Sequence, residues 1–114
     1  MKSPEFPGQG IPELRTDTHS WGAICDDHWD IKDAHVVCQM LGFRGAKKAP
    51  RGAHFGEGIG DIMLDEVDCT GVETNILDCG HNDLFIHDCK HNEDASVMCG
   101  YVAGEIRRTF KFLV

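Results

Sequence analysis

The chain has 114 residues, which suffice for one domain and exclude an enzyme of several domains. A hydrophobic fraction of 41% provides material for a core, and a formal charge of -8 argues against nucleic acid or anionic lipid as a dedicated partner and favours small cations. Because the sequence has no apolar window of membrane-spanning length and no signal-peptide pattern, we expect neither membrane insertion by this chain nor a signal of its own.

The first predicted strand follows an N-terminal segment without structure of its own. Residues 1–10 show no apolar periodicity and include Pro4 and Pro7, so we interpret them as residues left over from cloning or as a linker, and we place them outside the fold. In residues 20–25 the bulky apolar groups are spaced as in a short, half-buried strand.

A helix of about three turns is predicted next. Asp30 or Asp33 can cap its start and Gly42 lies where a C-terminal cap belongs, while apolar residues recur at helical spacing at Ala34, Val37, Cys38 and Leu41. The glycine-rich residues 43–61 lack periodicity, which predicts a long surface loop of the kind that often carries function.

Two more strands and a second helix are predicted in the remaining sequence. Residues 62–67 and 95–99 have strand patterns, and Thr70 with Glu73 has the spacing of a capping box, which predicts a second, shorter helix. Residues 101–114 form a tail that could be an edge strand or a fragment of a neighbouring segment. If the apolar tail is unpaired, it would favour self-association.

The cysteine content indicates disulfides. The even count lets every cysteine pair, and none has the C-x-x-C spacing of zinc ribbons or thioredoxin-type sites: Cys25, Cys38, Cys69, Cys79, Cys89 and Cys99. Spacing alone does not decide which cysteine pairs with which. Disulfides persist in oxidising compartments, so we expect an extracellular or secretory location.

Four ordered motifs together resemble a known family. They are Trp21-Gly-Ala-Ile-Cys-Asp-Asp-His-Trp-Asp30, Asp33-Ala-x-Val-Val-Cys-x-x-Leu-Gly42, Phe55-Gly-x-Gly-x-Gly60 with Leu64-Asp65, and Asp88-Cys-x-His-x-Glu-Asp-Ala-x-Val-x-Cys99. In kind, order and spacing they resemble the scavenger receptor cysteine-rich domain, in its group A form with six cysteines. The match departs from the family at the start, where only Glu13-Leu14-Arg15 corresponds to part of the usual first strands.

This resemblance implies an α+β domain over residues 11–100. We expect a small, curved antiparallel sheet that cradles one main helix, plus a second short helix. The group A pattern implies the disulfides Cys25–Cys89, Cys38–Cys99 and Cys69–Cys79, which close long loops and should contribute a large part of the stability of so small a domain.

Acidic residues beside the cysteines predict a calcium site. Asp26 and Asp27 follow Cys25, and Glu93 lies shortly after Cys89, so the implied disulfide would bring three carboxylates together. Oxygen ligands on loops suit Ca²⁺ better than zinc, and the resemblance implies calcium at these positions. A second, weaker site is expected near Asp65, Glu66 and Asp88. The alternative is a solvated acidic face or a carboxylate that caps a turn.

A basic cluster on the glycine-rich loop predicts contact with an anionic ligand: Arg44, Lys47, Lys48 and Arg51. The alternative is a loop whose charges only confer solubility. The glycines at 56, 58 and 60 do not have the spacing of a dinucleotide-binding loop, and both tryptophans, Trp21 and Trp29, are expected in the core.

We therefore predict an extracellular binding module rather than an enzyme. It would recognise polyanionic or protein ligands with the help of Ca²⁺, as part of a larger secreted or membrane-anchored protein. The alternative function is a structural spacer or docking domain beside a catalytic domain, without a ligand of its own.

Overall fold

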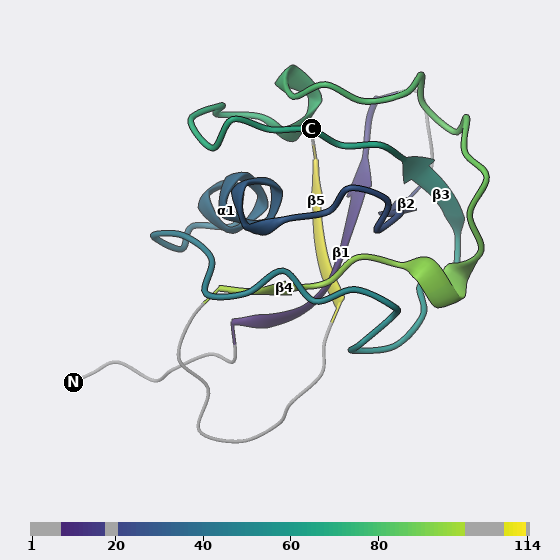
Figure 1. Cartoon of the computed structure of the whole chain (residues 1–114), viewed down its shortest axis with the longest axis horizontal. Coiled ribbons are helices and arrows are strands. Elements are labelled where there is room, and N and C mark those ends of the chain that lie inside the picture. The colour runs from purple at the N-terminus through teal and green to yellow at the C-terminus, as the bar shows by residue number, and fades with distance from the viewer. Residues whose placement is uncertain (1–7, 18–20, 100–108, 114) are drawn as a thin grey trace.

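One mixed β-sheet and one helix form the framework of the molecule (Figure 1). The computed structural model describes residues 8–17, 21–99 and 109–113. Its elements in chain order are β1 (Gln9–Arg15), β2 (Gly22–Ile24), α1 (Ile31–Met40), β3 (Asp61–Leu64), the 3-10 turns η1 (Ile76–Asp78) and η2 (His91–Glu93), β4 (Val97–Met98) and β5 (Thr109–Leu113).

The sheet contains both parallel and antiparallel strand pairs, so the prediction of a purely antiparallel sheet is wrong. The strand order is β3-β2-β1-β4, with β5 also paired to β1. β1 runs antiparallel to β2 and β4, whereas β2 and β3 are parallel and so are β1 and β5. Parallel neighbours need a long crossover connection, and α1 with the glycine-rich loop provides it between β2 and β3.

The two ends of the described chain meet in this sheet. β1 begins at Gln9, and both Gln9 and Gly10 pair with β4, so the sheet includes two residues that the sequence interpretation placed in the N-terminal segment. In the tail, residues 109–113 form a strand beside β1, as the edge-strand interpretation predicts. The remaining tail residues, 100–108 and 114, lie outside the described part.

The main helix begins and ends as predicted. Asp30 is the N-cap and accepts hydrogen bonds from the backbone N–H groups of Lys32 and Asp33, and the Asp33 carboxylate accepts one in return from Asp30 N. Asp33 also accepts from Cys69 N at 2.8 Å. Burial raises the pKa of Asp33 to about 6, because the charged form is held away from water. After Leu41, Gly42 has a φ of +97°, which favours glycine at this exit.

The predicted second helix is reduced to the single turn η1. Glu73 does accept from Thr70 N, at 2.9 Å to Oε2, and this and other backbone N–H donors lower the pKa of Glu73 to about 2. However, Gly71 has a φ of +105°, which an α-helix cannot accommodate, so the chain turns here. The 3-10 turn starts only after Asn75, whose side chain caps it.

The core lies between the sheet and α1, and all three implied disulfides are confirmed. Fully buried side chains from β1, β2, β3, β4 and α1 form one cluster that includes Leu14, Ile24, Val37, Leu64 and Val97. The pairs are Cys25–Cys89, Cys38–Cys99 and Cys69–Cys79, so no cysteine is free. Two of these disulfides enter the core cluster, so they stabilise the packed layer as well as the loops.

Candidate functional site

The structure brings the three predicted calcium ligands together. We call Asp26, Asp27 and Glu93 the acidic trio. Each is half-buried, and one carboxylate oxygen from each lies within 4.8 Å of those of the other two. The Cys25–Cys89 disulfide joins the two segments, and the backbone N–H of Asp26 donates to the carbonyl of Glu93 at 2.8 Å. The trio is therefore held by one covalent and one backbone link.

Hydrogen bonds from the backbone orient two members of the trio. Asp26 Oδ2 accepts from Gly52 N at 2.7 Å, which anchors the glycine-rich loop beside the trio. Glu93 Oε1 accepts from Lys90 N at 3.1 Å and closes the η2 turn. The alternative that one of these carboxylates caps a turn is thus correct for Glu93 Oε1, whereas Asp26 Oδ2 bonds a distant loop, and each carboxylate has a second oxygen.

Asp27 lies at the centre of the negative charge. Its pKa is raised by burial and by the charges of nearby Asp65, Asp88 and Glu93. Both Asp27 Oδ2 and Asp88 Oδ1 lie 3.7 Å from the Sγ of Cys89. Repulsion of this kind is relieved by a bound cation, so the charge pattern favours cation binding at Asp27.

The second predicted set is less well assembled. Asp65 is buried and its Oδ1 accepts from Glu66 N at 2.8 Å, while Glu66 Oε1 lies 2.7 Å from His28 Nδ1. Among the described residues, Asp65, Glu66 and Asp88 do not form a group with ligand atoms within 4.8 Å of one another. The structure therefore places Asp65 and Asp88 around Asp27 and pairs Glu66 with a histidine.

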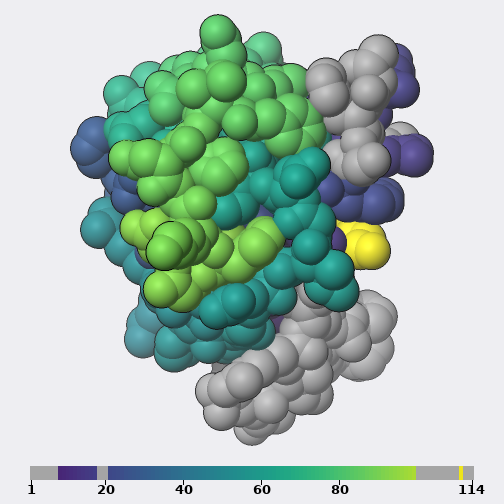
Figure 2. All heavy atoms as spheres, turned by 90° about the vertical axis from the view of Figure 1, so that its right-hand side faces the viewer, coloured from purple at the N-terminus to yellow at the C-terminus, as the bar shows by residue number. Residues whose placement is uncertain are grey.

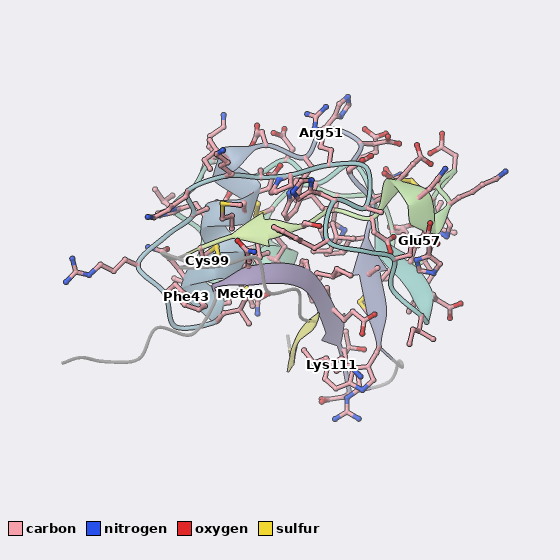
Figure 3. All side chains as sticks on the ribbon, turned by 90° about the horizontal axis from the view of Figure 1, so that it is seen from below. Met40, Phe43, Arg51, Glu57, Cys99 and Lys111 are labelled. Atoms are coloured by element: carbon pink, nitrogen blue, oxygen red, sulfur yellow. A yellow bond between two sulfur atoms is a disulfide. The ribbon has the colours of Figure 1, made fainter. Side chains whose placement is uncertain are left out.

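The four basic residues are exposed but do not form one patch. The backbone of Lys47 and Lys48 pairs with Met98 of β4. Arg44 follows the C-terminus of α1, and Arg51 donates from Nε to the carbonyl of Trp29 before the N-terminus of α1. The ten residues of α1 separate these ends by about 15 Å, and Figure 3 shows Arg51 far from Phe43, the neighbour of Arg44. Only Arg51 adjoins the trio, through Gly52.

A cavity of about 300 Å³ opens at another place on the surface. Its lining is Glu13, Trp21, Ile59, Gly60 and Lys111, and we call it the indole pocket. Trp29 is buried as predicted, with 1% of its surface exposed, but Trp21 is only half-buried and lines this pocket, so its expected place in the core is wrong. Sequence reasoning missed the pocket because Lys111 reaches it only through the pairing of β5 with β1.

His91 connects the two places. Its Nδ1 lies 2.7 Å from Asp94 Oδ2, and its Nε2 lies 2.6 Å from the carbonyl oxygen of Gly60. Burial lowers the pKa of His91, but the hydrogen bonds with Asp94 and Gly60 outweigh it and the net shift is upward. η2 therefore contributes Glu93 to the trio and holds the rim of the indole pocket through His91.

Comparison with known proteins identifies the family. The family model of the scavenger receptor cysteine-rich domain matches residues 5–100. The chain belongs to this family. A curated relative, lysyl oxidase homolog 3A of Danio rerio, is 52% identical over 99 residues, which is 87% of this chain and 13% of the relative.

Two solved structures of the family have the same fold. The scavenger receptor cysteine-rich domain of mouse MARCO, in its dimeric form, is 40% identical with a TM-score of 0.76, and the match covers 88% of this chain and 94% of that one. The third such domain of murine neurotrypsin is 43% identical with a TM-score of 0.74, and the match covers 87% and 92%.

Membership of the family establishes the general role. Scavenger receptor cysteine-rich domains are extracellular modules of larger secreted or membrane proteins, and they are typically non-catalytic binding modules. The chain spans 13% of the length of its lysyl oxidase relative. In the part of the chain that the structure describes, no helix is long and apolar enough to cross a membrane.

Proposed function

We propose that this domain is a calcium-dependent recognition module that acts outside the cell and binds polyanionic or protein ligands through an ion held by the acidic trio. The observation that carries the proposal is the convergence of three carboxylate oxygens within 4.8 Å, from two segments joined by a disulfide. The pairing of all six cysteines in three disulfides also supports an oxidising, extracellular location.

The ligand would complete the coordination of the ion. Ca²⁺ takes about six to eight oxygen ligands, more than three half-buried carboxylates supply, so positions remain for water or for a carboxylate, sulfate or phosphate of a ligand. Arg51 adjoins the trio through Gly52 and is, of the four predicted basic residues, the one best placed to contact the same anionic group. Lys47, Lys48 and Arg44 would contact only a more extended polyanion.

A calcium titration of the melting temperature tests the ion site. If the dissociation constant is on the order of 0.5 mM, as in extracellular modules, about 5 mM Ca²⁺ stabilises the fold by about 1.4 kcal/mol, or roughly 5 °C. Glu93→Gln should remove this shift, whereas Asp83→Asn, the same kind of change at an exposed acidic residue outside the trio, should keep it. An unchanged melting temperature of the unsubstituted domain at millimolar Ca²⁺ would favour the spacer function instead.

Retention on immobilised heparin tests the ligand class. We expect retention that requires Ca²⁺ and that Arg51→Gln weakens more than Arg44→Gln, because these two arginines lie at opposite ends of α1. Equal retention with Ca²⁺ and with a chelator would contradict recognition through the ion, even if the melting temperature responds to calcium.

A further inference from the structure

The indole pocket is lined by a buried carboxylate that has few hydrogen-bonding or charged partners among the described residues. Glu13 is 5% exposed, and the one hydrogen bond that its side chain accepts from the described residues is long, 3.4 Å from Ile59 N to Oε2. Gly58 makes room for this oxygen, since a Cβ at Gly58 would lie 2.8 Å from it. A buried carboxylate without a charged partner is costly. The pocket therefore favours a cation that enters it.

A lysine of the chain itself already occupies the mouth of this pocket. The register of β1 and β5 places Lys111 opposite Glu13, and the Lys111 ammonium lies 5.4 Å from the centroid of the Trp21 ring. Arg15 lies over the same ring at 5.2 Å. Among the described residues, Lys111 and Glu13 are not close enough to form an ion pair. In Figure 2 the yellow atoms of β5 reach the surface between β1–β2 and the glycine-rich loop.

The backbone beside the pocket accepts an added strand. Residues 11–15 of β1 pair in parallel register with residues 109–113, and Leu14 lies between β2 on one edge and β5 on the other. β5 follows the residues matched by the family model, which end at 100. Without β5, the edge of β1 would present unpaired N–H and C=O groups, which is the usual template for strand addition.

We propose that this edge of β1, together with the indole pocket, is a docking site for an extended, lysine-bearing peptide segment of a partner protein, and that residues 109–113 occupy it in cis. Backbone hydrogen bonds would supply affinity, while the Trp21 ring and the Glu13 carboxylate would select a cationic side chain at the position of Lys111. None of the residues that line the indole pocket belongs to the acidic trio, and Figure 3 shows Lys111 on the opposite side of the molecule from Arg51. It needs no calcium.

Peptide binding to a full-length variant tests this site. Lys111→Pro removes the cation and a backbone N–H, so it should release β5 and open the edge. The probe is the blocked peptide Thr-Phe-Lys-Phe-Leu, the sequence of residues 109–113, measured by fluorescence anisotropy. We expect saturable binding to Lys111→Pro with a dissociation constant below about 1 mM, which is the effective concentration typical of a tethered segment. The unsubstituted chain, whose own β5 competes for the edge, should bind the peptide at least about tenfold more weakly.

The selection of lysine has its own control. Thr-Phe-Glu-Phe-Leu should bind at least about tenfold more weakly than the lysine peptide, and Glu13→Gln in the Lys111→Pro chain should reduce the difference.

Lys111→Glu provides a variant with an intact strand backbone, in case proline impairs folding, and it should also admit the lysine peptide. Equal binding of the two peptides, or no binding to either folded variant, would overturn the proposal. If the unsubstituted chain forms a concentration-dependent dimer and no variant binds the peptide, we would conclude instead that β5 is exchanged between two copies of the chain.

Discussion

The acidic trio and the indole pocket are built by different means. The trio lies directly beside two cysteines, and its segments are joined by the Cys25–Cys89 disulfide. The pocket depends on strand pairing between the two ends of the described chain and on a glycine-rich loop. One region is held covalently, whereas the other is held by hydrogen bonds and packing alone.

This difference distinguishes a site whose geometry must stay fixed from a site in which one strand can be replaced by another. Carboxylates that repel one another need an external constraint, and a disulfide provides one that does not depend on the charge state. A strand held by backbone hydrogen bonds can be replaced by another strand of suitable sequence. Three predictions test whether the two regions are independent in this way.

The largest effect is expected from removal of the disulfide beside the trio. Cys25→Ala with Cys89→Ala opens a loop of 64 residues, which the chain-entropy model values at about 4 kcal/mol of stability. The matched control, Cys69→Ala with Cys79→Ala, opens a loop of 10 residues and should cost about 3 kcal/mol. Unfolding with and without Ca²⁺ should show that the calcium shift is lost only in the first variant. If both variants keep the shift, the disulfide is not what holds the trio.

A smaller effect is expected at the pocket. In Gly60→Ala the new Cβ would lie 2.6 Å from the backbone oxygen of Trp21, so the loop must move and the domain should lose about 1 to 3 kcal/mol. Gly80→Ala, where the nearest atoms are at 3.6 Å, should change stability by less than about 0.5 kcal/mol. The calcium shift should survive in both variants. Its loss in Gly60→Ala would show that His91 couples the two regions.

The smallest effect concerns the charge of Asp27 without calcium. Its pKa is raised above the ordinary 3.8 by burial and neighbouring carboxylates, so the folded chain holds the proton more tightly than the unfolded chain. The contribution of Asp27 to the free energy of unfolding therefore falls as the pH rises above about 4. In a chelator at pH 7, Asp27→Asn should be as stable as the unsubstituted domain or up to about 1 kcal/mol more stable. A lower melting temperature would indicate that the carboxylate stabilises the fold.

The sequence was most informative near the cysteines. α1 was predictable because Asp30, Gly42 and the apolar spacing are local signals, and the acidic trio followed once the family pattern implied the Cys25–Cys89 pair. The direction of β3 and the reduction of the second helix to η1 were not predictable in the same way. The first depends on how a long crossover packs, and the second depends on the backbone conformation that Gly71 adopts.

The arrangement of the basic residues and of the pocket also lay beyond sequence reasoning. Arg44 and Arg51 are close in sequence, but the loop between them runs along α1 and pairs with β4, so they separate in space. Lys111 and Glu13 are distant in sequence and become neighbours only through a parallel strand pair. Long-range pairing of this kind leaves no local pattern for sequence reasoning to detect.

The parallel direction of β1 and β5 also determines how the domain would respond to tension. A force that pulls the start of β1 away from the end of β5 acts along both strands in opposite directions. It loads the hydrogen bonds between them together, in shear, instead of peeling them apart one by one. Because shear breaks these hydrogen bonds together, we expect the β1–β5 pair to resist such a force more strongly than an antiparallel pair pulled at the same two ends.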